Sequence, residues 1–289
     1  MKGIEPLVFL AAVLLTSPML LLEGSETVGV ERITAYILTS LAFSSVGILA
    51  YYRGLEFLTA GSTHASFLAV TVGYLISAMH GLNLYYSALP VGLILVYTAG
   101  YLVYRGMDPV KVSSFFVSFT TALGVLVAYY TLTRFPAQYS LSSIMLGDPV
   151  LMTRQDAVFA MVLSVIIVAV AIAVYRPIVF ISVDPVSARV SGLNMRLYDL
   201  ATFTLIGLAT IGLLRVSGYI MEHVMIFLPP LIGARFSTSS RDHFASTLLS
   251  STMASVLGYT LALNYGLSPV GLSGLILIAV YVYFLARGR

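Results

Sequence analysis

Cysteine is absent from this 289-residue sequence, and lysine occurs only twice. The lack of cysteine excludes a disulfide framework, thiolate metal ligands and a thiol nucleophile. Lys2 follows Met1 and Lys111 follows Val110, so neither lysine belongs to the Gly-Lys-Ser/Thr sequence that holds nucleotide phosphates in a P-loop. The chain therefore has no P-loop, and any energy from ATP has to come through another chain.

Charge is also scarce, since Asp, Glu, Lys and Arg together make up 9% of the residues. Soluble globular domains contain about 25%. Hydrophobic residues make up 59% of the chain, which is too many to bury in one core, so we expect most of them to face a lipid bilayer. The net charge is +3 and the basic residues are scattered singly, without the basic run that indicates a nucleic-acid partner.

Apolar segments of the length that crosses a membrane recur along the whole chain. A transmembrane helix needs about 20 apolar residues, and these runs are too long and too unalternating for a β-barrel. The first run lacks a small-x-small cleavage site, so we interpret it as a retained span rather than a signal peptide. We predict an all-α, polytopic transmembrane bundle of about nine spans plus one short broken helix, forming a single domain over residues 1–289. The expected spans are 4–22, 33–52, 60–79, 85–104, 112–132, 156–175, 197–215, 244–263 and 268–286.

The distribution of Lys and Arg predicts the orientation, because these residues favour cytoplasmic loops. With the N-terminus inside and the broken helix counted as a crossing, only Arg32, Arg134, Arg154 and Arg215 of the 15 basic residues fall outside. The opposite orientation reverses this distribution. We therefore expect a multi-pass protein of the cell (cytoplasmic) membrane with both termini in the cytoplasm.

The longest predicted inner loop, residues 175–199, contains a short helix with its own start and stop residues. Asp184 is a favourable N-cap, and Pro185 suits the first helical position, where its missing N–H is harmless. Gly192 provides the left-handed residue that ends the helix, about two turns later. Such a turn is compatible with an ordinary connector, or with a rigid lever held beneath the membrane for a soluble partner.

The same loop, SVDPVSARVSGLNMRLYDL, resembles the Asp-Pro-x-x-Ala-(x)3-Gly loop of the metal-type ABC importer permeases, the membrane subunits of zinc, manganese and iron uptake systems. Other segments resemble that family in the same order, from about residue 32 onward. They are GSTHASFLAVTVGYL, IMLGDPVLMTRQD (with Leu146 where the family has phenylalanine), VSGYIMEHVMIFLPPLIGAR and LSPVGLSGLILIAVYVYFL.

The resemblance implies a permease of the type II, cobalamin-importer-like architecture, in which two copies form a central pathway. A cytoplasmic ATPase subunit binds the short helix in a cleft and supplies the ATP chemistry, and an extracytoplasmic protein delivers the metal ion. The choice between zinc, manganese and ferrous iron stays open. Ala188 is expected on the face that enters the cleft, and the implied docking positions are Asp184, Pro185, Ala188, Arg189 and Gly192.

A secondary transporter, coupled to protons or sodium and working without an ATPase, is the main alternative. Such a protein is expected to carry a buried carboxylate in the middle of a span. We identify no such residue in the central parts of the predicted spans, so the sequence favours the importer permease. A passive channel, which would present a ring of identical residues at a narrow point, also stays open.

The segment YIMEHVMIFLPPLIG, residues 219–233, combines Glu222 and His223 with two prolines. Pro229 and Pro230 each remove an amide donor, which predicts a short helix followed by a second helical piece. Carboxylate and imidazole both bind Zn²⁺ and Mn²⁺, so Glu222 and His223 are candidate metal ligands. Adjacent helical residues point about 100° apart, so one copy is not expected to hold an ion with both. They either meet their counterparts across a dimer axis or lie in the wet outer membrane interface.

Two further residues are candidates for the translocation pathway. His64 lies one turn inside the third span, where it is either hydrogen-bonded between packed helices or, as the resemblance implies, part of the pathway. Pro229 is placed along the pathway by the resemblance, whereas Glu222 and His223 occupy positions that are small or hydroxyl residues in the family. His243, in a predicted cytoplasmic region, is expected only to cap a helix.

Overall fold

The computed structural model describes residues 29–135, 147, 149–150 and 152–286. These residues contain helices and no strand. The predicted first span, 4–22, and most of the IMLGD segment lie outside the described residues. The helices are α2 (Val30–Arg53), α3 (Glu56–His80), α4 (Leu84–Tyr104), α5 (Pro109–Arg134), α7 (Arg154–Val183), α8 (Pro185–Val190), α9 (Met195–Gly212), α10 (Leu214–Phe236), α11 (Ser240–Tyr265) and α12 (Pro269–Ala286).

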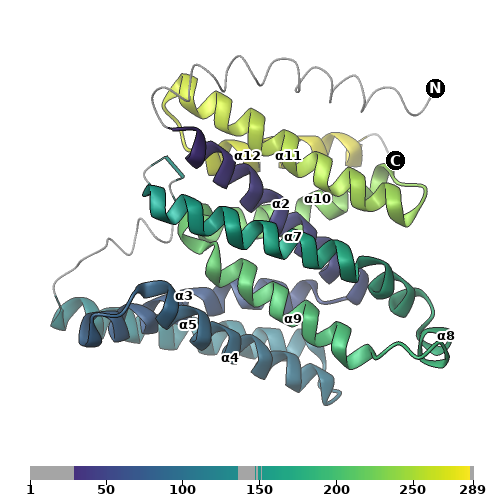
Figure 1. Cartoon of the computed structure of the whole chain (residues 1–289), viewed down its shortest axis with the longest axis horizontal. Coiled ribbons are helices and arrows are strands. Elements are labelled where there is room, and N and C mark those ends of the chain that lie inside the picture. The colour runs from purple at the N-terminus through teal and green to yellow at the C-terminus, as the bar shows by residue number, and fades with distance from the viewer. Residues whose placement is uncertain (1–28, 136–146, 148, 151, 287–289) are drawn as a thin grey trace.

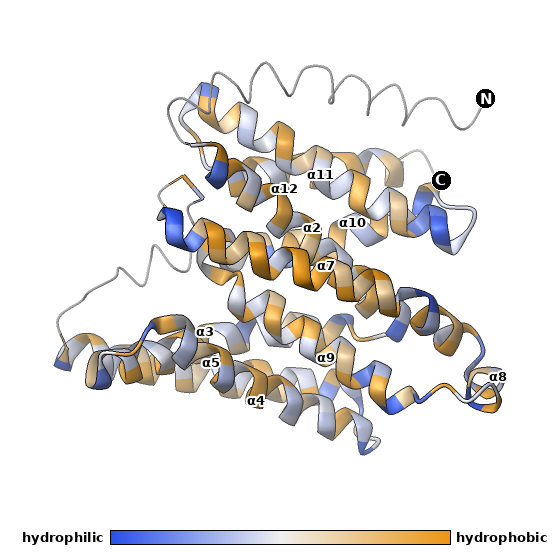
Figure 2. Cartoon of the chain, in the orientation of Figure 1, coloured by the Kyte–Doolittle hydropathy of each residue, from blue (hydrophilic) through white to orange (hydrophobic). Residues whose placement is uncertain are grey.

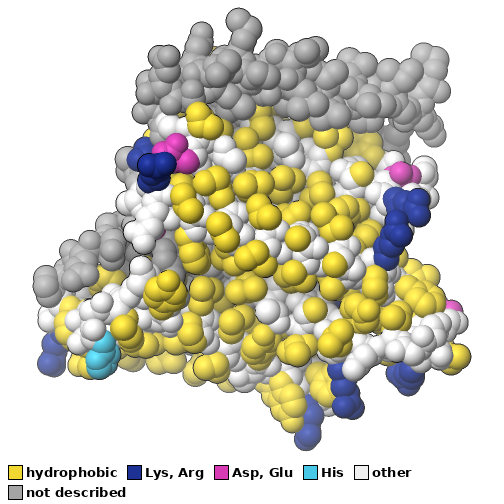
Figure 3. Space-filling view, in the orientation of Figure 1, with side chains coloured by type: hydrophobic (Ala, Val, Ile, Leu, Met, Phe, Trp, Pro, Cys, Tyr) yellow, Lys and Arg dark blue, Asp and Glu magenta, His cyan; other side chains and the backbone are white. Residues whose placement is uncertain are grey.

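The helices have the length and composition of membrane spans, so the predicted all-α, polytopic bundle is confirmed. Seven of them within the described residues are long and apolar enough to cross a bilayer, and α9 coincides with the predicted span 197–215. Hydrophobic residues predominate along α7, and the most hydrophilic residues lie mostly near the ends of the helices (Figure 2). One face of the molecule is broadly apolar, with Lys and Arg side chains at its edges (Figure 3).

Helix α2 forms the centre of the bundle and is the most enclosed of the candidate spans. It packs against α7 on one side and against α10 and α11 on the other, while α3, α4 and α5 form a neighbouring group joined to the rest largely through α9 (Figure 1). Hydroxyl groups tie α2 to the C-terminal helices. The Tyr36 hydroxyl lies 2.9 Å from Ser273 Oγ, and the Ser251 hydroxyl donates to the Ser40 carbonyl at 2.9 Å. Small polar residues of this kind allow close helix packing in lipid.

The predicted break in the segment 219–233 is in the wrong place. Helix α10 runs through both Pro229 and Pro230, and its one non-helical residue is Gly218, with φ +66° and ψ +165°. A β-carbon at Gly147 would lie 2.2 Å from the Gly218 nitrogen, so Gly147 lies directly against this break. Enclosure of this kind lets prolines stay inside a membrane helix, because neighbouring groups cover the backbone that they disturb.

The second proline leaves the Ile226 carbonyl without its normal amide donor, since that carbonyl would accept from residue 230. This carbonyl faces Gly47 on α2, where a β-carbon would lie 1.9 Å from the carbonyl oxygen. Only glycine allows the two backbones to approach this closely. The unusual helix α10 is therefore accommodated by the central helix α2.

We expect Gly47→Ala to destabilise the protein by about 1–3 kcal/mol, the usual cost of overpacking, because its methyl group would meet backbone rather than a movable side chain. The measurement is the melting temperature in detergent. Gly271→Ala is the matched control, because the nearest atom to its new methyl group is 3.8 Å away. Equal melting temperatures for the two variants would contradict the close α2–α10 contact.

Candidate functional site

Helices α3, α5 and α10 bring two histidines together inside the bundle. The rings of His64 on α3 and His223 on α10 lie edge to face, with their centroids 5.8 Å apart. The Nδ1 atom of His64 is 3.3 Å from the Thr121 hydroxyl on α5. Each histidine is partly buried. The sequence placed both residues among the pathway candidates but gave no indication that they meet.

A threonine neighbour determines which nitrogen of His223 carries the proton. The Thr63 hydroxyl donates its one hydrogen to the Ala60 carbonyl at 2.7 Å. Its oxygen lies 2.9 Å from His223 Nε2, so it accepts from that nitrogen. In the neutral ring the lone pair is then on Nδ1. Metal-binding histidines usually have this arrangement, in which the second nitrogen donates to a neighbour and the ring is held in one orientation.

Glu222 is fully buried in α10, 0% exposed, which excludes the wet interface for this residue. Neither carboxyl oxygen has a hydrogen-bond partner in the described part of the chain. Ser66 on α3 is nearby, but its hydroxyl donates to the Thr63 carbonyl at 2.6 Å. Glu222 is therefore the buried mid-span carboxylate that the sequence analysis did not identify.

Glu222 and His223 do not form a preassembled chelate in one chain. Within the described residues there is no group of three or more His, Cys, Asp or Glu side chains arranged to hold a metal ion. The arrangement offers two imidazoles from different helices, with a buried carboxyl on the adjacent position of α10.

The proline region of α10 is buried and is attached to two other helices. Pro229 and Pro230 are both buried, and the Pro230 carbonyl accepts from His243 Nε2 on α11 at 2.9 Å. The other nitrogen of His243, Nδ1, is 3.0 Å from the Tyr52 hydroxyl at the end of α2. The prediction that His243 only caps a helix is therefore wrong: Ser239 caps α11, and His243 joins three helices.

The short helix α8 has the predicted start and stop residues. The Asp184 side chain accepts from the Ser187 amide at 2.9 Å, Pro185 is the first helical residue, and Gly192 has a φ of +82°. Hydrogen bonds from the Ser187 side chain and amide hold the pKa of Asp184 below its ordinary value. The cap is therefore ionised at neutral pH, and its contribution is lost only as the pH falls through that lowered pKa.

The outer face of α8 differs from the predicted one. Ala188 is 0% exposed, so it packs inward and does not form part of an outward surface, whereas Pro185, Arg189 and Gly192 are exposed. The exposed apolar residues are Val183, Val186 and Val190, at 75%, 72% and 84%. Val186 and Val190 are four residues apart in α8 and lie on one side of its turn, and Val183 is the last residue of α7, directly before the Asp184 cap. These valines were not predicted, although valines among polar loop residues are a visible indication.

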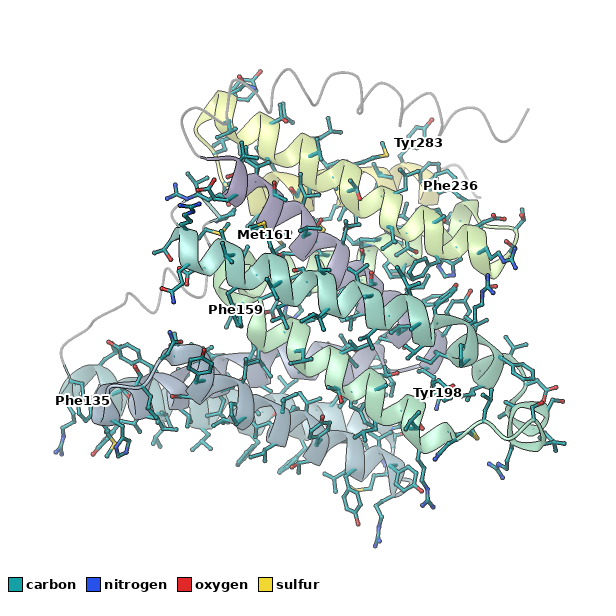
Figure 4. All side chains as sticks on the ribbon, in the orientation of Figure 1. Phe135, Phe159, Met161, Tyr198, Phe236 and Tyr283 are labelled. Carbon is teal, nitrogen blue, oxygen red and sulfur yellow. The ribbon has the colours of Figure 1, made fainter. Side chains whose placement is uncertain are left out.

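An ion pair that the sequence did not suggest connects α9 to α2. Both Arg53 Nε and Nη2 bond to Asp199 Oδ1, with the Nε distance 2.9 Å. Their side chains are 18% and 20% exposed. Tyr198, labelled in Figure 4, marks this first part of α9, close to α8. The pair therefore lies between the end of α2 and the loop that contains α8.

Together, the long apolar helices and the polar contacts enclosed between them define a multi-pass membrane protein. Residues 28–288 match the ABC 3 transport family, and the chain belongs to that family.

Its sequence is 22% identical over 278 residues to the manganese transport system membrane protein MntC of Listeria innocua, covering 93% of each chain. It is 24% identical over 261 residues to the manganese import system permease protein ScaB of Streptococcus pneumoniae, covering 86% of this chain and 85% of ScaB. The fold is similar to a chain of PsaBC from Streptococcus pneumoniae, solved in complex with Fab. The TM-score is 0.77 and the identity 17%, over 91% of this chain and 93% of that one.

We expect Thr63→Val to weaken the binding of Mn²⁺ or Zn²⁺ to the purified chain by about ten- to hundredfold, the usual effect of losing a group that orients a metal-binding histidine. Valine keeps the shape of threonine but cannot accept from His223. Titration calorimetry in detergent measures the affinity. Thr98→Val is the control, since its exposed hydroxyl bonds only to the Ile94 carbonyl. Equal affinities in the two variants would contradict the assigned role of Thr63.

Proposed function

We propose that this chain is the membrane permease subunit of an ATP-driven ABC importer for divalent transition-metal ions. The observation that carries the proposal is the contact between His64 and His223, two imidazoles from separate spans in a chain of this transport family. Imidazole is a common ligand of zinc, iron and other first-row ions. The relatives named above are manganese systems, so manganese, zinc and ferrous iron are the candidate ions.

Two partly buried imidazoles suit a pathway better than a storage site. A tight site needs three or four protein ligands, whereas an ion in transit has to leave again. The two imidazoles would replace part of the water shell of the ion without binding the ion tightly. Glu222, one position away and buried without a hydrogen-bond partner among the described residues, would place a carboxyl group close to that point.

The proposed working unit is a homodimer, in which residues 1–289 of each copy form one membrane domain. Helix α5 supports this, because it has exposed hydroxyls at Ser114, Ser118 and Thr121, spaced four and three residues apart. They form a polar line on an otherwise apolar outer face, next to His64. A second copy covering this line would enclose the histidines between the two chains.

The proposed partners are a cytoplasmic ATPase subunit and an extracytoplasmic metal-binding protein. We assign the ATPase contact to α8, where an ionised cap holds a rigid turn and three exposed valines offer an apolar surface. In this arrangement both termini are cytoplasmic, the chain itself is not an enzyme, and its partner hydrolyses ATP.

A secondary metal transporter is the second candidate, and Glu222 is the observation that favours it. A buried carboxylate in a membrane helix is costly and is often part of a proton relay. The same residue is compatible with an ATP-driven pathway, so transport measurements have to separate the two functions.

The deciding experiment compares the chain alone with the chain plus its copurifying ATPase in proteoliposomes. We expect Mn²⁺ or Zn²⁺ to accumulate only when the ATPase, ATP and the metal-binding protein are all present. The chain alone should not accumulate either ion, with or without ATP. Uphill uptake by the chain alone under a proton gradient would refute the importer and support secondary transport.

Docking on α8 has its own test. Val186→Asp puts a charge on the apolar surface without touching the Asp184 cap, so we expect the ATPase to copurify with it at about one tenth of the wild-type level, a loss typical of a central apolar contact. Ser191→Ala, which removes an exposed hydroxyl bonded to the Ser187 carbonyl and leaves the Asp184 cap intact, is the control. Full copurification with Val186→Asp would mean that α8 is only a connector.

A further inference from the structure

Two neighbouring residues at the end of α2 make polar contacts in opposite directions. Arg53 bonds to Asp199 near the start of α9. Tyr52, the residue before it, bonds to His243 on α11, and His243 bonds to the Pro230 carbonyl on α10. The result is a series of polar contacts through four helices, in which the backbone of α2 joins Tyr52 to Arg53.

The direction of each hydrogen bond follows from the available donors. The Pro230 carbonyl can only accept, so His243 Nε2 carries the hydrogen and donates to it at 2.9 Å. In the neutral ring Nδ1 then accepts from the Tyr52 hydroxyl at 3.0 Å. Both ring nitrogens of this buried histidine are therefore used, and neither contact can be lost without leaving a polar atom unsatisfied.

One end of this series lies next to the proposed docking helix. Gly192 and three further residues separate α8 from α9, and Asp199 is the fifth residue of α9. A partner that binds and displaces α8 therefore acts close to the start of α9, where Asp199 lies. Because Arg53 bonds to Asp199 through two nitrogens, both the orientation of the Arg53 guanidinium and its distance from the Asp199 carboxylate are restricted.

The other end reaches both helices that contain the paired histidines. Pro230 lies seven residues, about two turns, after His223 on α10. On the other side, Gly54 follows Arg53 with φ +63°, and α3, which contains His64, starts two residues after this left-handed turn. Movement at Tyr52 and Arg53 therefore reaches α3 through the chain and α10 through His243.

We infer that Asp199, Arg53, Tyr52 and His243 are positioning residues that couple the docking helix to the two histidines of the pathway. They touch neither the ion nor ATP. They transmit the displacement of α8 to α10 and α3, so that ATP hydrolysis by the partner changes the separation of His64 and His223. This inference rests on the proposed importer function.

The test uses the complete importer in proteoliposomes, with Mn²⁺ uptake and ATP hydrolysis measured in the same vesicles. We expect Tyr52→Phe and Asp199→Asn each to lower the number of ions transported per ATP by about two- to thirtyfold, the range found for residues within coupling networks. ATPase copurification should be unchanged, since α8 itself is intact. Asp199→Glu keeps the charge and should restore most of the ratio.

Tyr51→Phe is the matched control. Tyr51 is adjacent to Tyr52 and its ring also contacts His243, but its hydroxyl makes no hydrogen bond within the part of the chain that the structure describes. Its ratio of ions to ATP should equal that of the wild type. The double variant Tyr52→Phe/Asp199→Asn should lose little more than the worse single variant, because both interrupt one series of contacts.

Three results would overturn the inference. The first is an unchanged ratio in both single variants. The second is a fully additive loss in the double variant, which would mean two independent contacts. The third is a lowered melting temperature with uptake and hydrolysis reduced in proportion, which would mean a purely structural role. Absence of ATP-driven uptake in the wild-type importer would instead refute the proposed function itself.

Discussion

The structure depends on one constraint of the bilayer: a backbone polar group that loses its helical partner has to be covered by protein, because lipid offers no hydrogen bond. Helix α10 has a non-helical residue at Gly218, and Pro229 and Pro230 each remove one backbone hydrogen bond from it. This irregular helix is tolerated because α2, α11 and Gly147 pack against it. Gly47 approaches the Ile226 carbonyl, and His243 reaches the Pro230 carbonyl.

This enclosure also places the candidate pathway. A helix that must be surrounded by protein is held against α3, and the same packing brings His223 to Thr63 and His64. Two polar rings and a carboxyl can then lie at membrane depth without facing lipid. The irregular backbone and the candidate site are thus consequences of the same packing between helices.

Local features were predictable from the sequence because they depend on a few neighbouring residues. Composition alone identified a helical membrane protein, and Asp184, Pro185 and Gly192 predicted the start and end of α8. Predictions that needed tertiary contacts were less accurate. The prolines suggested a break that packing prevents, Ala188 faces inward, and His243 joins helices that are far apart in sequence. The contact between His64 and His223 spans about 160 residues, and no local pattern indicates it.

The central claim is that both histidines contact the transported ion, and pulsed electron paramagnetic resonance of Mn²⁺ bound to the purified permease tests it most directly. Mn²⁺ is paramagnetic, so a coordinated imidazole gives a nitrogen coupling that water and carboxylate ligands lack. The account predicts nitrogen couplings in the wild type that weaken in His64→Ala and in His223→Ala and disappear in the double variant, while His80→Ala leaves them unchanged. A spectrum of Mn²⁺ with oxygen ligands only, identical in all four variants and the wild type, would contradict it.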